Sequence, residues 1–218
     1  MYLFEFFTNN LFFSEVPVIA GALLLLMVVG WWRFCWLGYS AIVAFCFCLF
    51  FFRNPTRSCP EARNNTSVIV CPADGKVTLI EQLPNGGAFG QRISIFLSLF
   101  DVHVNWMPIS GKIKQIVHTP GSFSPAYLAT SASSNERNEI VIKSTTGGLV
   151  MVRQIAGIIA RRIVCWADQK QIIRAGQKFG MIRFGSRVEL LLPEDTEFNV
   201  GVGQQVYGGQ TVIGWLPR

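Results

Sequence analysis

The first quarter of the chain consists almost entirely of apolar residues. Residues 16–32 and 34–52 form uncharged segments of 17 and 19 residues, separated by Arg33. A helix needs about 20 apolar residues to cross a bilayer, and tryptophan, which flanks Arg33 on both sides, favours the membrane interface. We therefore predict a membrane anchor over residues 1–53 with two transmembrane helices, at about 16–32 and 34–52. A single long tilted span is the alternative.

The hydrophobic pattern changes after Pro60, where short runs rich in Val, Ile and Phe alternate with turns that contain Gly or Pro. Such punctuation is typical of compact all-β domains. We expect strands at 68–70, 76–80, within 92–106, 112–117, 139–142, 149–155, 161–166, 187–192 and 212–215. The single helical candidate is 127–133. The pattern predicts a mainly β domain over residues 54–218.

Charge is distributed unevenly between these two parts. Only 15% of the 218 residues are charged, against about 25% in typical soluble domains. The charges in residues 1–52 are Glu5, Glu15 and Arg33. The remainder holds 18 of the 19 basic and 11 of the 13 acidic residues, a net charge of +7. The last three quarters of the chain contain no long apolar run, which excludes a polytopic transporter.

The basic residues also predict where the β domain lies. Arg53, Arg57 and Arg63 follow the second apolar segment. By the positive-inside rule, this places the β domain on the cytoplasmic side of the cell (inner) membrane. Basic side chains are scattered and are not interleaved with aromatic residues, so we expect no nucleic-acid binding.

The six cysteines do not predict a disulfide framework or a metal site. Cys35, Cys46 and Cys48 lie within the apolar segments, and the other three are scattered without a CxxC pair. Structural zinc needs four convergent ligands. We therefore expect no metal, and free thiols suit a reducing compartment.

The chain has two histidines, His103 and His118. In a strand, Asp101, His103 and Asn105 would share one face. A solvated face would explain these polar residues. General acid–base catalysis is the functional interpretation, because histidine titrates near neutral pH.

Two further candidates have ordinary local explanations. Asp74 belongs to a Pro-Ala-Asp-Gly turn, and Asp-Gly is common turn chemistry. Gly185 and Ser186 are not part of a G-x-S-x-G elbow, which disfavours a hydrolase. Taken residue by residue, the sequence does not determine a reaction.

Several motifs, taken together and in order, are more informative. They are residues 178–188 (KFGMIRFGSRV), residues 71–75 (CPADG), the 101–105 run leading to Pro108 and Gly111, residues 120–123 (PGSF), residues 135–137 (NER), residues 154–157 (QIAG) with 160–162 (ARR), and the end of the apolar start, residues 51–55 (FFRNP). This set resembles the phosphatidylserine decarboxylases, specifically the short bacterial, membrane-anchored type. The resemblance covers nearly the whole chain.

The resemblance implies a pyruvoyl enzyme of phospholipid biosynthesis with a barrel-sandwich catalytic domain. The Ser186 hydroxyl would attack the Gly185 carbonyl, and cleavage would give a large chain, 1–185, and a small chain, 186–218, that stay associated. Ser186 would become a pyruvoyl group. This group would form a Schiff base with phosphatidylserine in the membrane, releasing CO2 and phosphatidylethanolamine. Association into homo-oligomers is also common in the family.

The resemblance also assigns roles to individual residues. Asp74 matches the aspartate of an Asp–His pair that activates the serine. His103 matches the first histidine of the family's Asp-x-His-x-x-His-x-Pro window, but Trp106 replaces the second. Either His103 performs both tasks or His118 contributes.

The resemblance further leaves a set of arginines to bind the substrate phosphate or carboxylate, since arginine contacts both groups in a bidentate manner. Surface ion pairs are the alternative for each. These candidates are Arg137, Arg161, Arg162 and Arg183.

Two other functions remain open at this point. One is a related pyruvoyl decarboxylase that acts on another serine-headgroup lipid or on a small amino acid. The other is a membrane-anchored β domain that binds lipid without being processed.

Overall fold

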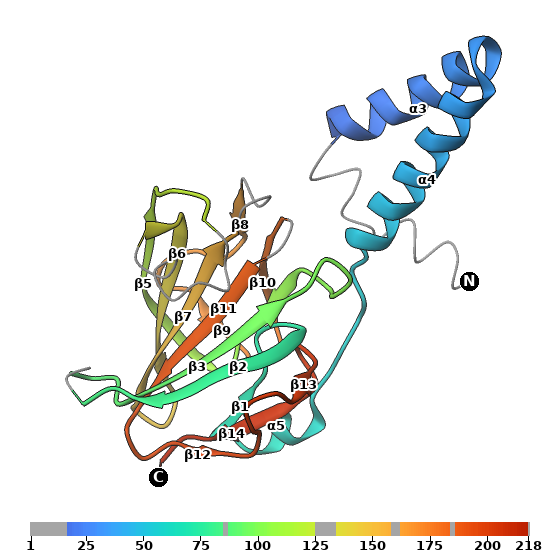
Figure 1. Ribbon diagram of the computed structural model, residues 1–218. Helices are drawn as coiled ribbons and strands as arrows, with labels where there is room; N and C mark the ends of the chain where they lie inside the picture. Colours follow the sequence, from blue (N-terminus) through green and yellow to red (C-terminus); the bar gives the residue numbers. More distant parts are fainter. Residues whose placement is uncertain (1–16, 85–86, 125–133, 158–161, 184–185, 218) are drawn as a thin grey trace. The chain divides into compact units, whose positions relative to one another are not determined.

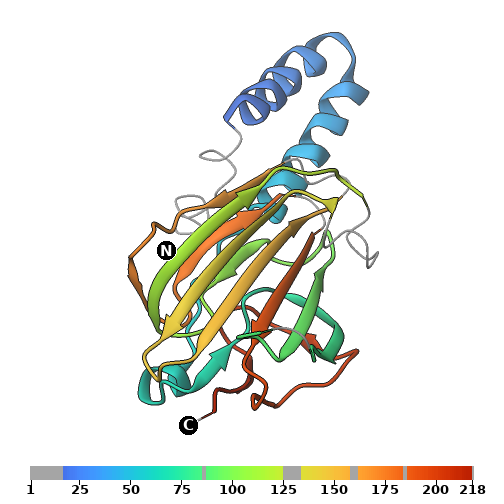
Figure 2. The same cartoon turned by 90° about the vertical axis from the view of Figure 1, so that its left-hand side faces the viewer.

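The computed structural model in Figures 1 and 2 describes residues 17–84, 87–124, 134–157, 162–183 and 186–217. The predicted helix at 127–133 lies outside these residues. The chain divides into two units, Met1–Thr56 and Arg57–Arg218, and each is described by itself below.

The first unit contains helix α3, Pro17–Arg33, and helix α4, Cys35–Phe51 (Figure 1). The two helices pack against each other near the turn, where a Cβ on Gly30 would lie 2.9 Å from the Gly38 nitrogen. Each helix has 17 residues. Within the described part of the chain, no helix has both the length and the apolar character needed to cross a membrane. The predicted pair of transmembrane helices is therefore not supported.

The second unit is built almost entirely from antiparallel strands, preceded by the short helix α5, Pro60–Asn64. The strands are β1 (Val68–Val70), β2 (Gly75–Gln82), β3 (Gln91–Leu97), β4 (Val104–Trp106), β5 (Gly111–Thr119), β6 (Arg137–Ser144), β7 (Leu149–Ala156), β8 (Ile163–Cys165), β9 (Ile172–Ile173), β10 (Lys178–Ile182), β11 (Ser186–Leu192), β12 (Glu197–Phe198), β13 (Gln205–Val206) and β14 (Val212–Trp215). The prediction of a mainly β domain is confirmed.

The largest sheet has the strand order β13-β2-β3-β11-β7-β6-β5-β9 and is seen face-on in Figure 2. Two smaller sheets have the orders β4-β10-β8 and β1-β14-β12. The predicted barrel is wrong in one respect, because the large sheet is open. Its two edge strands, β13 and β9, have two residues each, and among the described strands each pairs on one side only, with β2 and β5.

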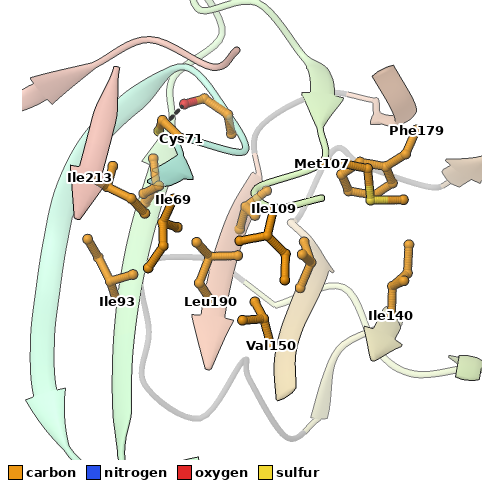
Figure 3. Close-up of a cluster of buried hydrophobic side chains, with 14 of the residues drawn as sticks. Ile69, Cys71, Ile93, Met107, Ile109, Ile140, Val150, Phe179, Leu190 and Ile213 are labelled. Atoms are coloured by element: carbon orange, nitrogen blue, oxygen red, sulfur yellow. Dashed lines mark hydrogen bonds between the residues drawn. The ribbon is translucent and has the colours of Figure 1, made fainter. Parts of the chain in front are cut away.

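The core lies on the inner face of the large sheet (Figure 3). Strand alternation sends Val188, Leu190 and Leu192 of β11 into this core. Phe179 and Ile182 of β10 pack into the same cluster from the second sheet. This period-2 pattern of branched apolar residues is what made most of the strands predictable from the sequence.

The opposite face of the same strands carries a network of ion pairs. Glu189 accepts from Arg153 Nη1 at 3.1 Å and lies 3.2 Å from Arg187 Nε. Arg153 Nε also donates to Glu139 at 2.7 Å. Burial lowers the pKa of Arg187. Because side chains alternate along β11, Arg187 lies in this ion-pair network and Ser186 lies on the inner face of the sheet.

Candidate active site

Ser186 begins β11, a central strand of the large sheet. It pairs with Leu97 in β3 on one side and with Ala156 in β7 on the other. The residue is fully buried, and its Oγ has no hydrogen-bond partner within the described residues. Buried hydroxyls normally have a partner, and exceptions often mark a reactive site. Gly185 lies outside the described residues.

His103 lies just before β4 and is fully buried. Its Nδ1 is 3.0 Å from the Asp101 carbonyl oxygen. A carbonyl can only accept, so Nδ1 is the donor in this contact. The Ile182 N–H donates to the His103 carbonyl at 3.2 Å, which ties His103 to the strand that leads toward Ser186.

Residues 101–105 do not form the single strand that would put their polar side chains on one face, because β4 begins only at Val104. His103 and Asn105 are both fully buried. Asp101 instead closes a turn, where its Oδ2 accepts from the N–H and the hydroxyl of Ser98 at 2.8 and 2.7 Å. The solvated-face explanation is therefore excluded for His103 and Asn105.

A chain of buried amides crosses from β6 to β4. Asn138 Nδ2 donates to Gln154 Oε1 at 2.9 Å, and Gln154 Nε2 donates to Asn105 Oδ1 at 2.8 Å. All three residues are at most 2% exposed. The sequence analysis did not identify Asn138 and Gln154 as members of a buried hydrogen-bond chain. Their positions on the inward side of otherwise apolar strands could have indicated it.

Asp74 is held by Arg57, a residue that the sequence did not indicate. The guanidinium contacts both carboxylate oxygens, with Nη2 2.9 Å from Oδ2, and the Gly208 N–H donates to Oδ1 at 2.8 Å. Arg57 also lies over the Trp106 ring, 4.9 Å from its centroid. The described hydrogen bonds and ion pairs of Asp74 thus involve Arg57 and Gly208, and His103 is not among them.

Sheet register nevertheless places Asp74 at the same end of the large sheet as Ser186. Lys76 in β2 pairs with Phe96 in β3. The next residue of β3, Leu97, pairs with Ser186. Asp74 precedes Lys76 by two residues, so it lies two strands from Ser186 and near the same row.

Comparison with known proteins now places this geometry in a family. A family model described as phosphatidylserine decarboxylase matches residues 45–214. The chain is also 41% identical over 200 residues to the phosphatidylserine decarboxylase proenzyme of Syntrophus aciditrophicus (strain SB). The aligned region covers 90% of this chain and 92% of that protein. The chain belongs to the phosphatidylserine decarboxylase family. The resemblance inferred from the sequence motifs is therefore confirmed.

Two residues that the family resemblance had suggested lie apart from Ser186. His118 is on β5, three strands away, with a side chain that is 50% exposed and an Nε2 3.6 Å from Glu136 Oε1. Arg137 Nε lies 4.0 Å from Glu139 Oε2. Alternation with the inward-facing Asn138 puts Arg137 on the face opposite to Ser186.

Two further arginines suggested by the phosphatidylserine decarboxylase resemblance, Arg162 and Arg183, lie next to the ends of β8 and β10. The Arg183 N–H donates to the Arg162 carbonyl at 3.3 Å, so the two residues lie side by side, and Arg183 precedes Ser186 by three positions in the sequence. Arg162 is exposed and Arg183 is half-buried. Arg161 lies outside the described residues.

The Cys71 thiol is buried, and the described residues include no cluster of metal ligands. Burial raises the pKa of Cys71 to about 12, and its Sγ lies 3.0 Å from the Ala73 carbonyl oxygen that accepts its hydrogen. In the described part of the chain, no three His, Cys, Asp or Glu side chains converge. The described residues of the site include a buried hydroxyl on Ser186, a buried imidazole on His103 and the buried amides of Asn105 and Gln154.

Proposed function

We propose that this chain is a phosphatidylserine decarboxylase that cuts itself between Gly185 and Ser186 and turns Ser186 into a pyruvoyl group. The observation that carries the proposal is the fully buried Ser186 Oγ without a partner in the described residues, at the start of a central strand. Leaving a hydroxyl buried and unpaired costs about 1–3 kcal/mol. A site that tolerates this cost fits a serine reserved for chemistry.

His103 is the base that we assign to the first step. In this role the imidazole takes up the proton of the Ser186 hydroxyl as that oxygen attacks the preceding carbonyl carbon, and the contact between Nδ1 and the Asp101 carbonyl holds the ring in place. His118 is half-exposed and three strands away, which argues against it. Asp74 lies at the same end of the sheet, where Arg57 holds its carboxylate in a fixed orientation.

The pyruvoyl group would supply an electrophilic carbonyl that binds the substrate amine and delocalises the negative charge left when CO2 departs. The protein has to bind the acidic headgroup and exclude water. Arg162 and Arg183, adjacent at the ends of β8 and β10, are suited to the phosphate or the carboxylate.

Denaturing mass spectrometry of the purified protein tests the self-cleavage. We expect two chains, 1–185 and 186–218, the smaller one blocked by a pyruvoyl group. Ser186→Ala should remain a single chain. Ser94→Ala is the matched control, because Ser94 is a buried serine of the neighbouring strand β3 whose Oγ is 3.2 Å from Glu189. An uncut wild-type chain that is folded would contradict the proposal.

Release of labelled CO2 tests the substrate. Phosphatidylserine in detergent micelles should be decarboxylated, whereas free serine should not. The reverse preference would favour a related pyruvoyl decarboxylase of small amino acids.

Two histidine variants test the assignment of the base. His103→Gln should slow self-cleavage at least a hundredfold, in line with the usual contribution of a positioned base of about 10²–10⁴. His118→Gln should cleave at the wild-type rate. An equal reduction of the self-cleavage rate in His103→Gln and His118→Gln would contradict the assignment of the base to His103.

We also propose that the first unit attaches the enzyme to the cell membrane, with the catalytic domain on the cytoplasmic side. Large apolar side chains are exposed on both helices, including Val18 at 83%, Trp32 at 97% and Val43 at 69%. Apolar surface of this extent is typical of membrane or protein contacts. Vesicles that contain brominated lipid should quench the tryptophan fluorescence of this unit. Unchanged fluorescence would contradict membrane attachment.

A further inference from the structure

The amide chain that ends at Asn105 leaves one donor unused. Asn105 Oδ1 accepts from Gln154, but Asn105 Nδ2 is buried and has no partner within the described residues. An amide N–H that is buried without an acceptor is as costly as the unpaired hydroxyl of Ser186. The buried side-chain atoms without a hydrogen-bond partner in the described part of the chain thus include a nucleophile, Ser186 Oγ, and an amide donor, Asn105 Nδ2.

The orientation of the Asn105 amide is dictated by its neighbours. Asn138 donates to Gln154 Oε1, so the Gln154 amide presents its NH2 group to Asn105. If the Asn105 amide turned over, two NH2 groups would face each other. Gly180 leaves room for this arrangement, because a Cβ there would lie 3.2 Å from Gln154 Nε2.

Sheet register brings the unused donor into the same interior as Ser186. Gln154 pairs with Val188, two residues after Ser186, and Ala156 pairs with Ser186 itself. Cross-strand partners share a face, so the side chains of Ser186, Val188, Gln154 and Ala156 all point inward. Asn105 approaches this face from β4 and contacts it through Gln154.

We infer that Asn105 Nδ2 donates a hydrogen bond to the oxygen that becomes negatively charged during self-cleavage. This inference rests on the proposed self-cleavage. In that step Ser186 Oγ forms a bond to the carbonyl carbon of the preceding residue, the carbonyl electron pair moves onto its oxygen, and the hydroxyl proton goes to the base. The Ser186 nitrogen then leaves as the C–N bond breaks, the carbonyl re-forms as an ester and the nitrogen takes up a proton. Asn105 stabilises the charged oxygen without transferring a proton, and Gln154 is a positioning residue.

Three variants isolate the donor. Asn105→Asp replaces the NH2 group by an acceptor, and Asn105→Leu removes it at similar volume without adding charge. Gln154→Glu leaves Asn105 in place, but the Asn105 NH2 group must turn toward the new carboxylate and is then no longer an unused donor. The control is Asn199→Asp, the same chemical change at a surface asparagine.

Cleavage is followed on gels during cell-free synthesis of the full chain, and melting temperatures identify the variants that fold. A preorganised donor of this kind typically contributes a factor of about 10²–10³. We expect at least tenfold slower cleavage in each of the three variants, and the wild-type rate in the control. Gln154→Glu should add nothing further in the Asn105→Leu background, because it acts through Asn105.

The possible outcomes separate the two proposals. A wild-type chain that folds and never cleaves overturns the self-cleavage itself. A wild-type chain that cleaves, with folded Asn105→Leu protein cleaving within twofold of it, overturns only the role of Asn105. Additive losses in Asn105→Leu and Gln154→Glu would also overturn it, because Gln154 would then act independently.

Discussion

Removing the Arg57 side chain should destabilise the β domain strongly. Arg57 and Asp74 form a bidentate ion pair with side chains that are only 11% and 5% exposed. Breaking a buried pair by deleting one partner typically costs about 3–5 kcal/mol, because a charge is left buried without compensation. Arg57→Met leaves Asp74 with only its bond from the Gly208 N–H among the described contacts. The lost cation–π contact with Trp106 adds to the effect.

Urea unfolding in the uncut Ser186→Ala background measures this loss on a single chain. We expect Arg57→Met to lower the free energy of unfolding by about 3 kcal/mol or more. At roughly 2–4 °C per kcal/mol for a domain of this size, the melting temperature should fall by at least 6 °C. The free energy of unfolding of Arg57→Lys should lie between those of the wild-type residue and Arg57→Met, since lysine keeps the charge but not the bidentate geometry. Arg63→Met, an exposed arginine nearby in sequence, is the control and should change stability by no more than about 0.5 kcal/mol. If Arg57→Met lowered the free energy of unfolding by less than about 1 kcal/mol, no more than the Arg63→Met control does, the reasoning would be refuted.

Three further predictions concern the same unit. Gly180→Ala should destabilise the fold, as seen in a lower melting temperature, because its Cβ would lie 2.3 Å from the Val164 carbonyl oxygen; an unchanged melting temperature would contradict this. Burial, and secondarily the charge of Arg57, lower the pKa of Lys178 below its usual 10.5, so the unfolded chain holds that proton more tightly. Lys178→Met should therefore raise the free energy of unfolding at pH 7, and the gain should shrink as the pH rises through the lowered pKa toward 10.5; a gain that grows with pH in urea titrations would have the wrong sign. Iodoacetamide at pH 8 should spare Cys71 in the folded protein, because its thiol is buried with a pKa of about 12, and peptide mass spectrometry would reveal any labelling as fast as in unfolded protein.

The sequence predicted the strands that alternate clearly and missed those that depend on tertiary contacts. Runs such as 149–155 and 187–192 closely match β7 and β11. The run within 92–106 splits into β3 and β4, because Asp101 closes a turn between them. β10 is absent from the expected strands, and Gly180 in its centre is unfavourable for a strand by local propensity. Its pairing with β4 and β8 overrides that propensity.

The candidate site shows the same division. Ser186, His103 and Asp74 could be found from local motifs. Arg57 could not, because it meets Asp74 17 positions away and the Gly208 carbonyl 151 positions away, and only the folded topology brings these groups together. The direction in which the Asn105 amide points depends on Asn138 and Gln154 in two other strands, so no reading of the 101–105 window could supply it.

The central position of β11 has a consequence for molecularity. The strand lies between β3 and β7, and the later strand β14 lies between β1 and β12. Because β12 belongs to the same piece as β14, a break before Ser186 would leave the piece 186–218 joined to the rest by hydrogen bonds on both sides of β11, and by the pairing of β14 with β1 and of β13 with β2. The pieces could separate only by unfolding, and refolding would become a second-order reaction that slows on dilution. An uncut chain refolds at a rate independent of concentration. After self-cleavage, the unfolded pieces would have to meet before they refold, so unfolding at low concentration would be irreversible in practice.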